Sequence, residues 1–480
     1  MHKNLLTCFS IILVLAAGAH DAAAETGPNP FRAGAATANI TPKPGVLLDG
    51  TIMQIGPVKH IHDELFVRAL ALDDGITRLV IAICDCCFIE QDVYDKAKTI
   101  VNRRTGLPLD RMLFAATHSH CAIRAGHIGT GPLDDEYHEI LAERMADAVV
   151  SAIGNLAPAK IGWGSVDKPE YPRCRRWLMK PGMTGPDPFG QNHDQVKMTG
   201  AHDKNVVKPV GPVDPALSVL SVQHADGRPL ALLANYSIHY VAFKRGHVSA
   251  DYFGYFARRM KTLLGRGGDS PAFVGIMSNG TSGDTRAVSG RGDPFERMRK
   301  VGHDLAEEAR HLTKKIPHRG RVSLAMRQTE IDFDVRLPDK ARLAWANATW
   351  AAAQPKRKAG KSLTRPEVYA RETIHLSRFP PKKPIVLQAI RIGDLGIVAI
   401  PCEVFAETGL AVKRQSPLKQ TFTISLANGL GGYLPPPEQH KLGGYTTWPA
   451  RSSYLEIQAE PKIRQAVLRL LKEVAGKPKP

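Results

Sequence analysis

Residues 114–126 read FAATHSHCAIRAG and place two histidines, His118 and His120, two positions apart after a short apolar run. This pair has three interpretations: metal ligands, an acid/base pair, or ordinary polar residues at the end of a strand. Because residues i and i+2 of a strand share a face, both imidazoles are expected to point into one cavity. The chain has 18 histidines, so this spacing also arises by chance. Spacing alone leaves the three interpretations open.

Further polar groups come directly after apolar runs that have the character of strands. His239 follows the run 230–238, Glu403 follows 395–400, and the turn SNGTSGDT (278–285) follows a third run. Loops beyond strand ends are where open sheets build their sites. Three imidazoles and a carboxylate suit zinc, with one position left for water. Taken singly, His239 is better explained as a hydrogen-bonded strand-end residue and Glu403 as a surface acid, so these residues suggest a zinc hydrolase without establishing one.

The elements that must position these groups alternate between strands and helices. Turn residues predict hairpins within 65–87, 216–238 and 385–400. Apolar residues at helical spacing predict helices at 91–102, 134–153, 252–264, 294–314, 339–353 and 453–474. Because several neighbouring strands are hairpins, the expected fold is mixed α/β, α+β in character, with a mixed β-sheet core flanked by helices. The Gly- and Pro-rich stretch 169–215 is expected to be a loop.

The N-terminus has the pattern of a secretory signal peptide. A short basic start and an apolar run from Leu5 to Ala19 precede Ala22-Ala23-Ala24, an A-x-A cleavage pattern. The expected organisation is a signal peptide at 1–24 and one domain at 25–480, secreted or periplasmic. The formal net charge of +18 suggests peripheral contact with anionic surfaces, whereas no nucleic-acid-binding motif occurs. The sequence leaves the oligomeric state open.

Cysteines and basic residues are each concentrated in one stretch. After the predicted cleavage site, cysteines occur at Cys84, Cys86, Cys87, Cys121, Cys174 and Cys402. No C-x-x-C pair is among them, so a cysteine zinc site is not expected. The first three crowd one apolar run and are interpreted as buried free thiols, although export permits disulfides. The segment 354–384 carries nine Lys or Arg residues and is interpreted as a solvated surface insert.

A series of short motifs runs along the chain in a fixed order: AGAATANITP (33–42), HDELFVRALALDDG (62–75), ATHSH (116–120), RRWLMK (175–180), GPVDPALSVL (211–220), NYSIH (235–239), SADYFG (249–254), NGTSGDT (279–285), IPCEVF (400–405) and GGYLPPPEQHKLGGYTTW (431–448). This series resembles the catalytic domain of the neutral/alkaline non-lysosomal ceramidases, in particular a short bacterial secreted branch. The resemblance spans about Ala33 to Val474 and implies the catalytic fold of that family. The C-terminal immunoglobulin-like domain of the longer ceramidases is not expected.

The resemblance also implies a metal site with one zinc ion per chain. Its ligands would be His118, His239, Glu403 and Tyr433. A tyrosine twelve residues after the ligand tyrosine contacts substrate in that family, and Tyr445 lies twelve residues after Tyr433.

The remaining roles follow from the same resemblance. His120 would act as general base or proton shuttle, and Tyr445 and Arg175 would stabilise the developing oxyanion. Three residues of the turn after the third run would line the substrate pocket: Asn279, Gly280 and Asp284.

The chain departs from the ceramidase pattern where a serine is expected shortly after the Gly-Asp of the turn. Gly283-Asp284 is followed by Thr285-Arg286-Ala287, so the serine that would touch ceramide is absent unless Thr285 or Ser282 takes its place. The expected function is a secreted zinc-dependent hydrolase that cleaves an N-acyl amide bond in a small-molecule or lipid-like substrate. The alternative is a hydrolase of the same fold acting on another ester, amide or carbohydrate-derived substrate. A non-catalytic exported binding protein is a third reading.

Overall fold

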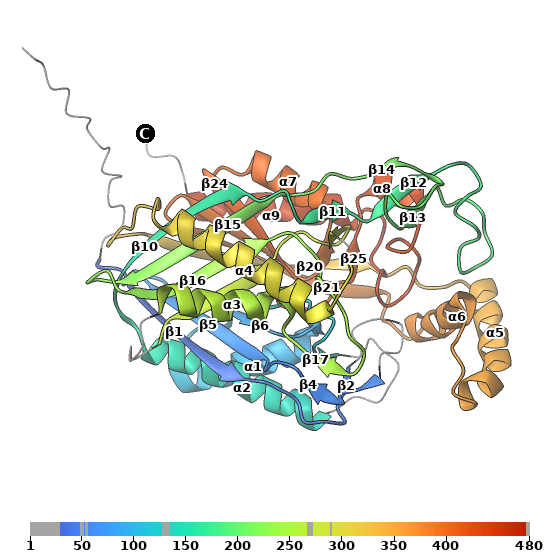
Figure 1. The fold of residues 1–480 in the computed structure, drawn as a ribbon, viewed down its shortest axis with the longest axis horizontal. Coiled ribbons are helices and arrows are strands. Elements are labelled where there is room, and N and C mark those ends of the chain that lie inside the picture. The colour runs from blue at the N-terminus through green and yellow to red at the C-terminus, as the bar shows by residue number, and fades with distance from the viewer. Residues whose placement is uncertain are drawn as a thin grey trace, which may run out of the picture.

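The computed structural model of the chain describes residues 29–48, 52, 56–126, 135–265, 272–288 and 290–476. The predicted signal peptide lies outside these residues. Strands and helices alternate along the described chain (Figure 1). None of the described helices combines the length and the apolar character needed to cross a bilayer.

The largest sheet in the described ranges has eight strands in the order β18-β16-β15-β10-β1-β5-β6-β8. Most neighbours are antiparallel, but β6 and β8 are parallel, as are β16 and β18. β1 and β10 pair at only two positions, so the sheet consists of two halves that are joined there. The strands are β1 (Arg32–Asn39), β5 (Phe66–Asp73), β6 (Arg78–Cys84), β8 (Met112–Ala116), β10 (Ala157–Asp167), β15 (Ala216–His224), β16 (Pro229–Tyr236) and β18 (Val274–Asn279).

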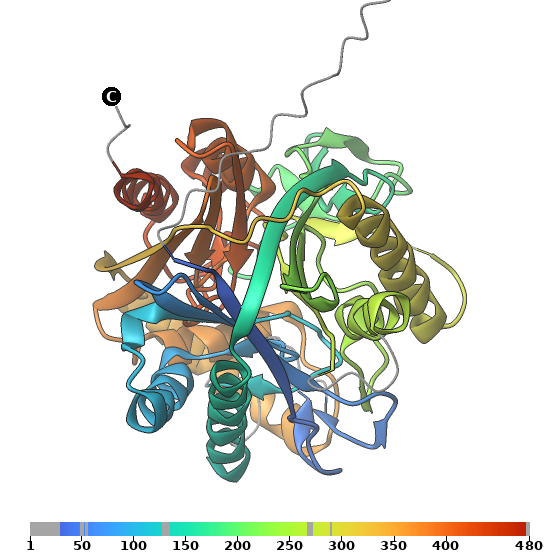
Figure 2. The same ribbon diagram turned by 90° about the vertical axis from the view of Figure 1, so that its left-hand side faces the viewer.

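A second sheet, of four strands among the described residues, faces the first. Its order is β20 (Leu324–Asp334), β21 (Lys382–Ile392), β22 (Leu395–Ile400) and β24 (Gln420–Ser425). One apolar core takes residues from both halves of the large sheet and from this second sheet. The view turned by 90° shows these groups of strands at the centre and the helices outside them (Figure 2). The expected mixed sheet core flanked by helices is confirmed.

Helices cover the outer faces of the sheets. α1 (Gln91–Thr105) and α2 (Asp135–Gly154) pack on the half with β1, β5 and β6. α3 (Asp251–Leu264) and α4 (Pro294–Thr313) cover the other half, and α9 (Ala459–Ala475) covers the second sheet. α4 begins where the Asp293 carboxylate accepts from two backbone amides, and its inner face repeats every three or four residues, at Met298, Val301 and Leu305.

The described chain also contains pairs of two-residue strands and further α-helices. Two-residue strands pair as β2 (Leu47–Leu48) with β3 (Gly56–Pro57), β4 (His60–Ile61) with β17 (His247–Val248), β7 (Phe88–Ile89) with β9 (Arg124–Ala125), and β23 (Glu403–Val404) with β25 (Tyr433–Leu434). The remaining helices are α5 (Lys340–Lys358), α6 (Arg365–Leu376), α7 (Ala406–Gln415) and α8 (Pro437–Leu442).

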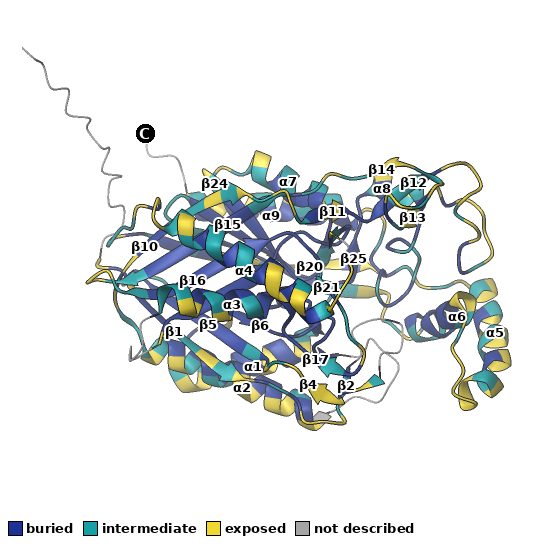
Figure 3. Cartoon of the chain, in the orientation of Figure 1, coloured by how far each residue is buried: buried dark blue, intermediate teal, exposed yellow. Residues whose placement is uncertain are grey.

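Two sequence-based interpretations are wrong in part. The stretch 169–215 contains β11 (Pro172–Cys174), which pairs with β19 (Thr285–Ala287), and a small sheet of β12 (Arg176–Met179), β13 (Val196–Met198) and β14 (Val206–Pro209). The basic segment 354–384 contains α6, which buries Val368, Tyr369 and Leu376 at helical spacing. Figure 3 shows α6 largely buried beside the more exposed α5. The last helix also starts at Ala459 rather than 453.

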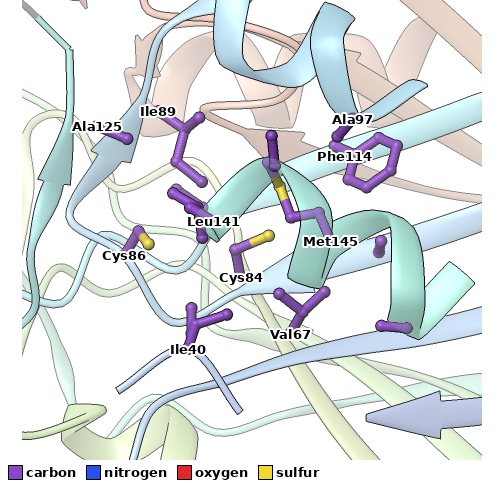
Figure 4. Close-up of a cluster of buried hydrophobic side chains, with 14 of the residues drawn as sticks. Ile40, Val67, Cys84, Cys86, Ile89, Ala97, Phe114, Ala125, Leu141 and Met145 are labelled. Carbon is purple, nitrogen blue, oxygen red and sulfur yellow. The ribbon is translucent and has the colours of Figure 1, made fainter. Parts of the chain in front are cut away.

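All six cysteines of the described chain are free and buried, which confirms the free-thiol interpretation of Cys84, Cys86 and Cys87. Cys84 and Cys86 lie among apolar side chains such as Leu141 and Met145 of α2 (Figure 4). Burial raises the pKa of Cys84 far above its usual value, so this thiol stays protonated and unreactive.

Candidate metal centre

His118 lies just beyond the end of β8 in a tight turn. Its amide donates to the Cys86 carbonyl, and its φ of 68° is in the left-handed region. The strand-face argument for His118 and His120 was therefore wrong, because neither residue belongs to the strand. The turn nevertheless brings their Nε2 atoms to 3.3 Å. A non-glycine residue held in this conformation stores strain of about 1–3 kcal/mol, which is common at functional sites.

Three segments that are distant in sequence bring His118, His239 and Glu403 together. His239 follows β16, and Glu403 opens β23 just after β22. Nε2 of His118 and Nε2 of His239 are 3.1 Å apart. Oε2 of Glu403 lies 3.3 Å from Nε2 of His118 and 3.9 Å from Nε2 of His239. Ligand atoms about 2.1 Å from a tetrahedral zinc ion are roughly 3.4 Å apart. The spacing of this His/His/Glu cluster therefore fits one metal ion.

Hydrogen bonds set the orientation of both imidazoles. Nδ1 of His118 lies 2.8 Å from the Cys87 carbonyl oxygen, and Nδ1 of His239 lies 3.2 Å from that of Ser282. A carbonyl only accepts, so both Nδ1 atoms carry a proton, and Nε2 is the atom of each ring that can bind a metal. Oε2 of Glu403 is buried and has no hydrogen-bond donor among the described residues. Three potential ligand atoms thus converge on one point beside a buried carboxylate, which requires a positive charge nearby.

The charges around the cluster agree with this geometry. Burial lowers the pKa of His118, but the Glu403 carboxylate outweighs it and raises that pKa to about 10, so the ring carries a positive charge at pH 7 that a metal ion would replace. Burial lowers the pKa of His239 well below its usual value, and the charge of Arg175 lowers it further. Burial and the charge of His118 lower the pKa of His120 in the same way. His239 and His120 are therefore neutral imidazoles at pH 7.

Tyr433 and Arg175 lie beside the cluster. Tyr433 is the partner of Glu403 in the short parallel pair of β23 and β25. Nη2 of Arg175 donates to the Tyr433 hydroxyl at 3.0 Å and to the Gly283 carbonyl at 2.8 Å, and it lies 3.8 Å from Oε2 of Glu403. Burial raises the pKa of Tyr433 well above its usual value, and the guanidinium opposes that rise.

Two cavities adjoin the cluster. The smaller, of about 30 Å³, is lined by His118, His120, Glu403, Tyr433 and Tyr445 among others. It has room for only one or two water-sized groups. The larger, of about 280 Å³, is lined by His239 and Arg175 together with Met198, Thr199, Tyr240, Val241, Arg286, Ala287 and Arg297. The cluster thus lies between a narrow cavity and a wider, basic one.

The turn that was predicted to line the substrate pocket is buried. Asn279, Gly280 and Asp284 are absent from the linings of both cavities in the described structure, so their contact with substrate stays a prediction. The turn supports the cluster instead. The Asp284 carbonyl accepts from the Arg175 amide at 2.9 Å. A Cβ at Gly283 would lie 2.3 Å from the Glu403 carbonyl oxygen, so only glycine allows this approach.

Three residues near the cluster were not predicted from the sequence. Tyr240, directly after His239, stacks on the His120 ring with 4.0 Å between centroids. Arg286 and Arg297 reach the wider cavity from β19 and α4. Arg286 could have been found, because it stands next to the position of the expected serine. Nothing in the sequence around Arg297 points to the site.

The fold and the cluster together define a mixed α/β protein with a candidate His/His/Glu metal centre at its strand ends. The structure is similar to that of neutral ceramidase from Pseudomonas aeruginosa, with a TM-score of 0.65 and 16% identity over 92% of this chain and 74% of that one. It is equally similar to a ceramidase complexed with C2, with a TM-score of 0.66, 16% identity, and 92% and 75% coverage. This likeness confirms the expected ceramidase-like fold. No family description and no curated protein matches the sequence.

Proposed function

We propose that the chain is an exported zinc-dependent hydrolase that cleaves an N-acyl amide bond, with residues 25–480 as its one domain after removal of a signal peptide. The observation that carries this proposal is the convergence of three potential ligand atoms, Nε2 of His118, Nε2 of His239 and Oε2 of Glu403, with both Nδ1 atoms turned to backbone carbonyls. The ceramidase-like fold supports it, because the cluster lies at strand ends of that fold.

His118, His239 and Glu403 would hold one zinc ion, with Tyr433 as the fourth protein ligand. Two neutral imidazoles and a carboxylate are donors that zinc accepts. Zinc, when bound, supplies a Lewis acid that polarises the acyl carbonyl and lowers the pKa of water. A phenol binds zinc well only as the phenolate, and the Arg175 guanidinium at 3.0 Å favours that form of Tyr433.

In the proposed reaction, water adds to the acyl carbon, the C–N bond breaks, and a carboxylate and an amine are released. His120 is neutral and lines the same narrow cavity as Glu403 and Tyr433. It would accept the proton of the water and pass it to the leaving nitrogen. The stack against Tyr240 fixes the plane of its ring.

Arg175 and Tyr445 would stabilise the oxyanion that forms at the acyl oxygen. Arg175 is held by Tyr433 and Gly283, so it needs no rearrangement to donate. Burial raises the pKa of Tyr445 to about 12, which keeps its hydroxyl protonated and able to donate. One such donor contributes about 10²–10³ in kcat.

Metal analysis of the purified mature protein tests the proposal. We expect one zinc per chain, lost in His118→Ala and Glu403→Gln and kept in the control His311→Ala, which changes an exposed histidine of α4. Absence of stoichiometric zinc, or unchanged zinc in His118→Ala, would refute the metal centre.

A substrate panel tests the reaction. A short-chain fluorescent ceramide is compared with N-acyl amino acids, esters and glycosides on the zinc-loaded protein. We expect turnover of N-acyl amides. Turnover confined to esters or glycosides would keep the metal centre and reject the amide assignment.

A further inference from the structure

The wider cavity beside His239 carries more positive charge than the proposed reaction uses. Three arginines line it, Arg175, Arg286 and Arg297, and we call this cavity the arginine pocket. No Asp or Glu is among its lining residues in the described chain. Arg175 is buried, with 7% exposure, whereas the other two are partly buried.

Each of these guanidinium groups has hydrogen-bonding capacity that no described residue uses. The Nε atom of each is buried and has no hydrogen-bond partner among the described residues. Arg297 donates to the Gly290 carbonyl, and Arg286 makes no ion pair with a described acid. Burial and the charge of Arg175 lower the pKa of Arg286, the direction expected for cations without an anion between them. Elsewhere on α4, Arg299 and Arg310 are paired with glutamates.

The surrounding backbone makes room for Arg286. A Cβ at Gly200 would lie 2.3 Å from an Nη2 atom of Arg286, so glycine at this position lets the guanidinium occupy its place. β19 pairs with β11 and fixes the strand that carries Arg286. Arg297 lies in the first turns of α4, whose N-terminus adds positive potential. The cations are therefore built into the pocket rather than free on the surface.

We infer that the arginine pocket binds a carboxylate on the amine part of the substrate, so that the preferred substrates are N-acyl amino acids. The inference rests on the proposed amide hydrolysis and adds the substrate class. Guanidinium groups bind carboxylates with paired, charge-assisted hydrogen bonds. His239 forms part of the pocket wall, so the anion lies close to the scissile bond, as an α-carboxylate does. Arg286 also stands beside the position where the ceramidase pattern has a serine.

Matched substrates test this assignment on the zinc-loaded mature protein. Lauroyl-glycine carries the carboxylate, lauroyl-glycinamide lacks the charge, and lauroyl-taurine carries a sulfonate. We expect kcat/KM to be highest for lauroyl-glycine, by about 10- to 100-fold over the glycinamide, as for loss of one charged hydrogen bond. Equal values, or a preference for the glycinamide, overturn the inference. A preference for the taurine substrate overturns the carboxylate assignment.

Variants then locate the effect. Arg286→Gln and Arg297→Gln should each lower kcat/KM for lauroyl-glycine by about 10-fold or more, mainly through KM, and change that for the glycinamide by less than about threefold. The charge-matched control is Arg291→Gln, an exposed residue outside the pocket lining. Equal losses on both substrates in variants with unchanged circular dichroism would refute anion recognition.

A binding experiment separates this inference from the proposed function. If no amide is hydrolysed, the reaction proposal fails, and calorimetry with N-acetylglycine and N-acetylglycinamide still tests the pocket. Tighter binding of N-acetylglycine, lost in Arg286→Gln and kept in Arg291→Gln, would support a carboxylate site without amide hydrolysis. Equal binding of the two probes would overturn it.

Discussion

Arg68→Met is the substitution whose cost the structure defines most closely. Asp85 is fully buried, and its carboxylate accepts from the Arg68 guanidinium at 2.6 Å and from the Phe66 amide at 2.9 Å. Arg68 is itself 5% exposed, so neither charge reaches water. Removing one member of such a pair leaves a buried charge uncompensated, so we expect the free energy of unfolding to fall by about 3–5 kcal/mol at about pH 8.

This loss should depend on pH. Burial raises the pKa of Asp85, and Arg68 opposes that rise. In folded Arg68→Met the pKa of Asp85 should therefore be higher still. A carboxyl whose pKa is raised by folding contributes stability at low pH, and that contribution is lost as the pH rises through the folded-state pKa. The difference between wild type and Arg68→Met should therefore grow with pH. Adding Asp85→Asn to the variant should recover most of the loss.

The same pair supports the proposed metal centre. Asp85 directly precedes Cys86 and Cys87, whose carbonyls accept from the backbone and ring of His118. We expect Arg68→Met to weaken zinc binding by about 10- to 100-fold, as other losses of ligand support do.

Urea denaturation of the zinc-loaded protein and chelator competition measure the two effects. The matched control is Arg299→Met, whose pair with Glu296 lies at the surface with 47% and 62% of the two side chains exposed, so its cost should be small. The reasoning would be refuted if Arg68→Met lowered the free energy of unfolding by less than about 1 kcal/mol, or by the same amount at about pH 5 and about pH 8.

Three further predictions concern the site and its surroundings. Gly283→Ala should weaken zinc binding by at least about 10-fold, because its Cβ would displace the Glu403 backbone; unchanged affinity in chelator competition contradicts this. Tyr445→Phe should lower kcat about 10²- to 10³-fold with zinc content unchanged, and a change in zinc alone would argue against oxyanion stabilisation. Burial raises the pKa of Asp251 to about 7, so its contribution to stability is present below its unfolded pKa and lost as the pH rises through about 7. The stability of wild type relative to Asp251→Asn should therefore fall between about pH 5 and about pH 8 in urea denaturation, and a constant difference would contradict the assignment.

Local sequence was enough to predict most of the fold. The three hairpins were predicted because their turns and alternating apolar residues lie next to each other in the chain. The short strands within 169–215 were missed because their pairing is not encoded locally; β11, for example, pairs with β19. In the basic segment, the many cations hid the apolar spacing of α6. Its Glu372 is buried with Arg371 and Arg451, a charged network that composition alone cannot distinguish from a solvated surface.

For the site, the ligand set came from the ordered motifs rather than from spacing. The prediction that His118 and His120 approach each other was right, but its strand-face reason was wrong, because the positive φ of His118 depends on hydrogen bonds to residues 86 and 87. The arginine pocket is formed by Arg175, which directly precedes β12, by Arg286 of β19 and by Arg297 of α4. Such a convergence arises only in the folded chain.

The contacts that orient the cluster are made largely by backbone atoms. Both imidazoles are fixed by backbone carbonyls, of Cys87 and Ser282, and Glu403 is supported by the close approach of Gly283. Backbone atoms are present whatever the side chains, so the surrounding sequence can change while the ligand geometry persists. The arginine pocket, by contrast, is made by side chains. By this proposal, a change there alters the preferred substrate without disturbing the proposed metal ligands, so the metal centre and the substrate class require separate experiments.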